Sequence, residues 1–161
     1  MIVDDSVDKL PFLWITLVFL GEYKHAIDSK RRIAIPAKFR KHLGETAVVA
    51  KGLEGSLFIY TKEEWQKLAE KLGTLPVGKA STRSFVRMML AGASEVEVDG
   101  LGRVLLPEYL TTHADLQKNV VIAGVFNRIE LWNEQRWEEY KKSAQENTDE
   151  IAERLGEMGA F

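Results

Sequence analysis

Basic side chains gather between residues 24 and 41, where seven lysines and arginines face one acid, Asp28. The seven are Lys24, Lys30, Arg31, Arg32, Lys38, Arg40 and Lys41. Residues 30 to 32 are all basic, so one short loop would present three cations. Phosphate groups attract such a loop, and arginine or lysine can also donate hydrogen bonds to guanine in the major groove. The pattern favours contact with double-stranded DNA.

Two of these cations have no obvious local acid beyond Asp28. We therefore expect Lys30 and Arg31 to contact DNA. The last three bases of the cluster fall on the exposed face of a short predicted helix: Lys38, Arg40 and Lys41. Solvation explains that face. Phosphate contact is the alternative, and Lys38 stays among the candidate DNA-binding residues.

Two aspartates each precede an arginine by four residues, Asp28 before Arg32 and Asp99 before Arg103. A carboxylate can hold a guanidinium by a charge-assisted bond and so fix a turn. We expect Asp28 and Asp99 to structure the turns. Arg32 and Arg103 are candidates for DNA binding or for this structural bond.

Catalysis has a weaker basis in the sequence. Two repeat-related acids can share a proton as in aspartic proteases, but Ser-Lys follows Asp28, Gly-Leu follows Asp99, and the neighbouring arginines favour the ionised form. The absence of cysteine removes a thiol nucleophile and thiolate metal sites. The histidines His25, His42 and His113 lack metal-ligand spacing. We expect no catalytic residue, metal, cofactor or small-molecule substrate.

The basic loop belongs to an internal repeat. Residues 28–36 (DSKRRIAIP) match residues 99–107 (DGLGRVLLP) at an offset of 71 residues. Flanking matches extend the repeat, including Gly21 with Gly92 and, after a slip of one residue, Trp65 with Trp137. The predicted organisation is a first repeat over 18–77, a linker helix over 78–91, a second repeat over 92–145 and an acidic tail over 146–161.

Each repeat predicts the same elements. A strand leads into the aspartate turn, and a second strand follows in which apolar residues alternate. Pro36 and Pro107 suit the first position of a short helix. A β-hairpin and a second helix follow, begun by Thr61 in one repeat and by Asn133 in the other. Three tryptophans at these positions are expected in packing rather than in base stacking: Trp65, Trp132 and Trp137.

The duplicated Asp-x-x-x-Arg-apolar-x-apolar-Pro element, preceded in its first copy by LGEYKHAID, resembles the MraZ family and, more distantly, AbrB/SpoVT-type regulators. The resemblance implies an α+β, β-rich fold: a duplicated swapped-hairpin, AbrB-like double-hairpin β-barrel with flanking helices. It also implies a ring-shaped homo-oligomer. Such proteins regulate transcription by binding repeated DNA sites upstream of the division and cell-wall gene cluster.

This chain departs from the family pattern in both turns. Arg31 stands where the family commonly has glycine, so either the turn avoids a positive φ or Arg31 adopts one at some strain. Leu101 stands where lysine is usual, which leaves the second turn with Arg103 alone. We expect the first repeat to contribute more of the binding.

The remaining sequence sets the cellular context. The apolar run from Leu10 to Leu20 is too short to span a bilayer and lacks the features of a signal peptide. Residues 1–17 are interpreted as an extension that can lie upstream of a true start at Val18. A cytoplasmic, nucleoid-associated protein without membrane contact is expected. The alternative function is an AbrB-like antitoxin that uses the acidic tail to hold a partner, although such antitoxins usually carry one repeat per chain.

Overall fold

The computed structural model describes residues 18–160. Within this range the structure has eight strands and six helices, and each half of the sequence begins with strands. The strands are β1 (Phe19–Ala26), β2 (Arg32–Ala34), β3 (Thr46–Lys51), β4 (Leu57–Thr61), β5 (Ser94–Glu97), β6 (Arg103–Leu105), β7 (Asn119–Phe126) and β8 (Arg128–Asn133). The helices are α2 (Ala37–Leu43), α3 (Lys62–Gly73), α4 (Ala80–Ala91), α5 (Glu108–His113), α6 (Glu134–Glu146) and α7 (Thr148–Glu157). The fold is α+β, as predicted.

Strand pairing joins the two halves of the sequence. Six strands form one sheet in the order β1-β7-β8-β4-β3-β5, and β2 pairs with β6 in a separate two-stranded sheet. All of these pairs are antiparallel. The hairpins β3–β4 and β7–β8 form within one half, whereas β1–β7, β3–β5, β4–β8 and β2–β6 each join one half to the other. Neither half therefore completes its sheet alone.

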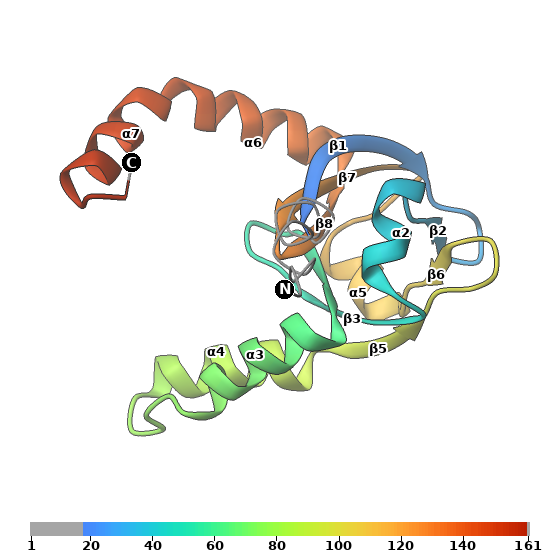
Figure 1. The fold of residues 1–161 in the computed structure, drawn as a ribbon, viewed down its shortest axis with the longest axis horizontal. Coiled ribbons are helices and arrows are strands. Elements are labelled where there is room, and N and C mark those ends of the chain that lie inside the picture. The colour runs from blue at the N-terminus through green and yellow to red at the C-terminus, as the bar shows by residue number, and fades with distance from the viewer. Residues whose placement is uncertain (1–17, 161) are drawn as a thin grey trace, which may run out of the picture.

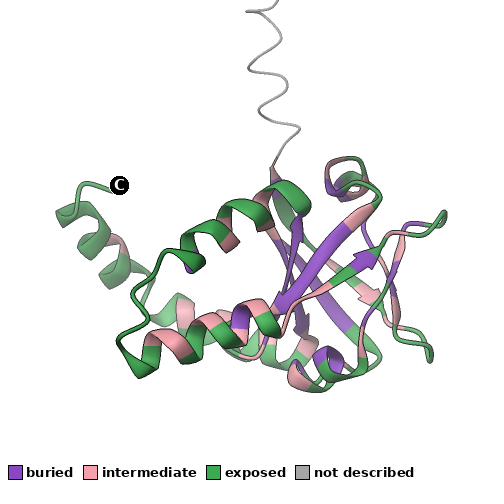
Figure 2. Cartoon of the chain, turned by 90° about the horizontal axis from the view of Figure 1, so that it is seen from below, coloured by how far each residue is buried: buried purple, intermediate pink, exposed green. Residues whose placement is uncertain are grey.

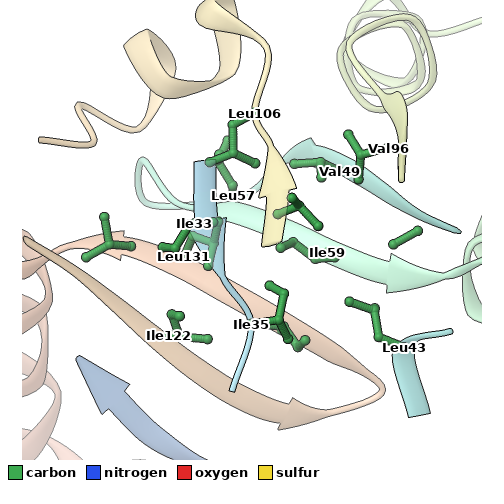
Figure 3. Close-up of a cluster of buried hydrophobic side chains, with 14 of the residues drawn as sticks. Ile33, Ile35, Leu43, Val49, Leu57, Ile59, Val96, Leu106, Ile122 and Leu131 are labelled. Atoms are coloured by element: carbon green, nitrogen blue, oxygen red, sulfur yellow. The ribbon is translucent and has the colours of Figure 1, made fainter. Parts of the chain in front are cut away.

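The main hydrophobic core lies between these strands and draws on both halves. Ile33 and Ile35, which alternate along and just after β2, are fully buried, as are their counterparts Val104 and Leu106. Figure 3 shows Ile33, Ile35 and Leu106 among side chains from the long sheet. Leu105, between the two buried residues of the second half, is 54% exposed. The period-two pattern of the sequence therefore correctly predicts which face turns inward.

Short helices α2 and α5 follow β2 and β6. The sequence places Pro36 and Pro107 at the first helical position, but both lie one residue earlier, at the N-cap, with extended ψ angles of 136° and 143°. A proline there still fixes φ and lacks an N–H that the helix would leave unpaired. Gly44 ends α2 with a φ of 83°.

The longer helices extend from the strand core. Thr61 caps α3 by accepting a bond from the Glu64 amide, and Asn133 caps α6 by accepting one from the Arg136 amide. Helix α4 turns back along α3, and together they bury Leu72 and Met89. Figures 1 and 2 show this helix pair and the α6–α7 segment projecting from the strands, with mostly exposed surfaces.

Within residues 18–160 no helix combines the length and apolar character that a bilayer span requires. The proposed extension, residues 1–17, and most of the apolar run lie outside the described residues.

Candidate nucleic-acid interface

Two repeat-related turns lie at one end of the molecule. Residues 27–31 connect β1 to β2, and residues 98–102 connect β5 to β6. Antiparallel pairing of β2 with β6 brings the turns together, with Arg32 opposite Leu105 and Arg103 opposite Ala34. Both loops project from the same side of the folded molecule in Figure 1. The pairing unites in space two repeat-related turns that are 71 residues apart in sequence.

Asp28 builds the first turn. Its Oδ1 accepts bonds from the backbone amides of Lys30 and Arg32, both at 2.9 Å, and its Oδ2 accepts one from Arg32 Nε at 2.7 Å. The backbone amide of Arg32, above all, lowers the pKa of Asp28, because these donors favour the charged carboxylate. Asp28 is therefore ionised when it holds the turn.

Asp99 repeats this arrangement. It accepts bonds from the amides of Leu101 and Arg103 and from Arg103 Nε, all at 2.9 Å. The backbone bond from Arg103 is the largest cause of its lowered pKa. Each aspartate thus uses both oxygens on donors of its own turn. This geometry does not resemble a proton-sharing carboxylate pair, in which the two acids bond each other.

Arg31 adopts the left-handed conformation, with φ at 60°, and Gly102 occupies the equivalent position with φ at 75°. Of the two outcomes considered for the missing glycine, the turn therefore takes the strained one. A left-handed conformation costs a residue with a Cβ roughly 1–2 kcal/mol. The strain persists because the Asp28 bonds fix the residues on both sides of Arg31.

Two guanidinium groups hold equivalent carbonyls beside these turns. Arg31 Nε donates to the carbonyl of Leu106 at 3.1 Å, and Arg40 Nε donates to the carbonyl of Ile35 at 2.6 Å. A Cβ on Gly102 would collide with the Arg40 guanidinium. Arg31 therefore supplies the guanidinium from the turn itself, whereas Gly102 leaves room for one from α2.

The role of Arg40 differs from the sequence-based interpretation, which placed it on a solvated helix face. Arg40 is half-buried and connects α2 of the first half to the turn of the second half. Sequence reasoning missed this contact because Arg40 and Gly102 are 62 residues apart. The glycine opposite Arg31 in the repeat alignment is the signal that could have indicated a close approach.

Exposed cations in and near the first turn make this end of the molecule positively charged. Lys30 and Arg31 are exposed, and Lys38 is exposed on α2. Within residues 18–160 none of the three forms an ion pair with a carboxylate. Arg32 and Arg103 are bound through Nε to their aspartates, although each side chain remains about 30% exposed, at 32% and 29%. Leu101, which is 65% exposed, adds no charge to the second turn.

A hollow of about 400 Å³ lies between the turns and β5. Arg31, Arg32 and Arg103 line it together with Glu95 and Glu97. In the part of the chain that the structure describes, no group of three or more potential ligands among His, Cys, Asp and Glu comes together to hold a metal. The hollow is bordered by residues of both turns and of β5.

The three tryptophans at positions 65, 132 and 137 pack against neighbouring side chains of the molecular body. Trp132 is 2% exposed, and its Nε1 donates to Glu130 at 2.9 Å. Trp137 lies against Trp132, with ring centroids 5.2 Å apart, and Trp65 lies 5.7 Å from Tyr60. This arrangement fits the packing interpretation. The buried Glu130 carboxylate, which also pairs with Arg128 at 2.8 Å, was not anticipated from sequence.

Comparison with known proteins identifies the family. A family model described as "MraZ protein, putative antitoxin-like" matches residues 18–88 and again 89–157. A protein named transcriptional regulator MraZ from Caldanaerobacter subterraneus subsp. tengcongensis is 50% identical over 138 residues, which cover 86% of this chain and 96% of the relative. Proteins of the same name from Heliobacterium modesticaldum and Halothermothrix orenii are each 49% identical, covering 86% and 88% of this chain and 96% and 99% of theirs. The chain, with its two matched repeats, belongs to the MraZ family of transcriptional regulators.

Proposed function

We propose that this protein regulates transcription by binding DNA in a sequence-specific manner through the turns at 27–31 and 98–102. The observation that carries the proposal is the pair of repeat-related turns at one end, with Lys30 and Arg31 exposed and free of carboxylate ion pairs in residues 18–160. Lys38 adds a phosphate contact. Arg32 and Arg103 contribute the guanidinium surface that Asp28 and Asp99 leave exposed.

The architecture that supports this function is an AbrB-like double-hairpin β-barrel. Repeats over 18–77 and 92–145 exchange hairpins, the segment 78–91 links them, and 146–161 forms an acidic tail. The strand pairs that cross between halves support this interpretation. In place of the two chains of a simple AbrB-like dimer, one chain supplies both halves.

Family membership also suggests a DNA target for this chain. We propose repeated sites upstream of the division and cell-wall gene cluster, bound by a ring-shaped homo-oligomer in the cytoplasm, at the nucleoid. Several turns that engage successive DNA repeats convert weak single contacts into tight binding by avidity. Spaced repeats are then a geometric requirement for full affinity.

Lys30→Ala provides the test, measured by fluorescence anisotropy on the DNA upstream of the gene and on a scrambled duplex over a salt series. Among the described residues Lys30 supports the turn through its backbone amide, which alanine keeps, so the loop geometry survives. We expect weaker binding and a log–log salt slope shallower by about 1 for each phosphate that the variant no longer neutralises. Arg32→Ala is less informative, because it also breaks the bond to Asp28.

Lys142→Ala is the matched control, since Lys142 is exposed on α6, outside the turns. It should bind like the unaltered protein. Equal affinity of the unaltered protein for both duplexes at every salt concentration would refute sequence-specific regulation and favour the antitoxin-like alternative.

A further inference from the structure

Arg31 makes two contacts with Leu106 of the opposite half. Its backbone carbonyl accepts a bond from the Leu106 amide at 2.9 Å, and its Nε donates to the Leu106 carbonyl at 3.1 Å. In the second turn the equivalent contacts with Ile35 are divided: the Gly102 carbonyl accepts the Ile35 amide at 2.8 Å, and Arg40 Nε donates to the Ile35 carbonyl at 2.6 Å. A glycine is thus sufficient to build this turn, and the Arg31 side chain is an addition to it.

This addition strains the backbone. Arg31 has a φ of 60°, in the left-handed region that residues with a Cβ avoid, whereas Gly102 adopts its φ of 75° without strain. Strained residues persist where the surrounding structure holds them, and they concentrate at binding and active sites. Asp28 supplies that support, because it accepts bonds from the amides on both sides of Arg31. The strain therefore points to a ligand for the Arg31 side chain.

Among the cations of the two turns, the Arg31 guanidinium is both oriented and unneutralised. Its Nε donates to an uncharged carbonyl, which limits rotation and leaves the full positive charge. Arg32 and Arg103 are also held through Nε, but by the aspartates of their own turns. The Lys30 ammonium has no bonded partner among the described residues, so it is free to rotate. A side chain that is oriented before binding loses less entropy when it forms directional hydrogen bonds.

The surroundings of Arg31 favour an uncharged ligand. Its outer nitrogens, Nη1 and Nη2, have no hydrogen-bond partner in residues 18–160. Arg31 lines the hollow between the turns and β5, which Glu95 and Glu97 also line. Lys62 pairs with Glu95 at 2.9 Å, whereas Glu97 forms no ion pair in the part of the chain that the structure describes. A carboxylate beside this hollow repels a DNA phosphate, so the edge of a base is the better ligand there.

We infer that Arg31 is a specificity-determining residue, which donates from Nη1 and Nη2 to O6 and N7 of one guanine in the major groove. Guanine presents two adjacent acceptors there, and they match the parallel donors of a guanidinium. Gly102 has no donor of this kind at the equivalent position, so the first turn alone reads this guanine. The inference rests on the proposed function and assigns the choice of one base to one residue of that surface.

Replacement of single guanines tests the contact. Deazaguanine has carbon in place of N7, so it keeps the base pair and removes one acceptor from the major groove. Fluorescence anisotropy measures binding to a short duplex that carries one repeat from the DNA upstream of the gene, with deazaguanine at each guanine in turn. The affinity of the unaltered protein should fall about tenfold at one guanine, as for the loss of one hydrogen bond to a charged group. Arg31→Gly should bind more weakly and should not respond to deazaguanine at that position.

Two further variants separate base reading from charge. Lys30→Ala should weaken binding to the original and the substituted duplex by the same factor, because a phosphate contact does not depend on the base. Arg31→Lys keeps the charge but lacks the planar pair of donors, so it should keep the salt dependence and lose the response to deazaguanine. Circular dichroism should report a native fold for Arg31→Gly, because glycine adopts a φ of 60° without strain.

The outcomes distinguish this inference from the proposed function. Selective binding to the upstream DNA with no responsive guanine, or with the same response in Arg31→Gly, would overturn the role of Arg31 and leave the regulator in place. A full response in Arg31→Lys would overturn the bidentate contact. Equal affinity of the unaltered protein for the upstream and scrambled duplexes would overturn the proposed function itself, and the inference with it.

Discussion

At the scale of single residues, the two turns reach one geometry by different means. Asp28 and Asp99 accept equivalent sets of hydrogen bonds. Arg31 and Gly102 then adopt the same left-handed conformation, one with a long cationic side chain and one with none. The arginine accepts backbone strain and adds a charge where DNA contact is proposed. The glycine carries no charge, and its lack of a side chain leaves room for the Arg40 guanidinium.

Gly102→Ala should lower the free energy of unfolding by about 1–2 kcal/mol, since a Cβ is disfavoured at positive φ and would also displace Arg40. Urea denaturation measures the loss. The control is Gly100→Ala, where a Cβ meets no atom within 4 Å, and it should change stability by less than about 0.5 kcal/mol. Equal effects of the two substitutions would contradict the close contact between turn and helix.

Two histidines at repeat-equivalent positions predict pH-dependent stability. Burial lowers the pKa of His42, which packs on Phe19, and that of His113, whose Nε2 is buried without a hydrogen-bond partner among the described residues. The unfolded chain, with histidine pKa near 6.5, then binds more protons than the folded chain just below that pH. Stability should fall as pH decreases from about 6.5 toward the folded-state values.

Urea unfolding at pH 8 and at pH 5.5 measures this dependence. The His42→Gln/His113→Gln variant removes both titrating groups and should show a smaller difference between the two pH values. A variant with the same pH dependence as the unaltered protein would assign the effect to other groups.

At the scale of elements, the short strands β2 and β6 contribute both to the core and to the position of the turns. Their inward residues complete the core, and their pairing sets the two turns next to each other. The backbone amide of Leu106 donates to the Arg31 carbonyl at 2.9 Å, and that of Ile35 donates to the Gly102 carbonyl at 2.8 Å. The turns therefore depend on the strands of the opposite half for their position.

Neighbouring leucines of the second half test this alternation. Leu106→Ala removes a fully buried side chain and should cost about 2–5 kcal/mol. Leu105→Ala removes one that is 54% exposed and should cost less than about 0.5 kcal/mol. Thermal or urea unfolding provides the comparison, and similar losses for the two variants would contradict the alternation of buried and exposed residues.

Local patterns predicted the elements well, and non-local contacts less so. Alternation at Ile33 and Ile35 and the caps Thr61 and Asn133 all left readable signals, because neighbouring residues determine them. The pairing of β2 with β6 and the contact of Arg40 with the second turn left none, because they join residues far apart in the chain. The Asp28 turn was predictable, whereas the bond from Arg31 to the Leu106 carbonyl was not.

At the scale of the whole molecule, four strand pairs between the halves make one structural unit from two repeats. The main core contains residues of both. Neither repeat can keep its sheet or its core when the other unfolds, so folding should be cooperative.

Hydrogen exchange along a urea titration tests this cooperativity. Peptides from the hairpins 46–61 and 119–133 should lose protection at the same urea concentration, because their strands β4 and β8 pair directly. Separate midpoints for the two hairpins would contradict the single unit. Helix α7, with no buried residue, should exchange earlier and provides an internal reference for local opening.

The fusion of two halves into one chain also affects how the turns can evolve. In a symmetric dimer of identical single repeats, one codon change alters both turns at once, and each must tolerate what the other needs. Here Arg31 and Gly102 are encoded separately. Substitutions can therefore improve ligand binding by one turn while the other turn takes on a structural role, and both turns keep the same aspartate-centred geometry.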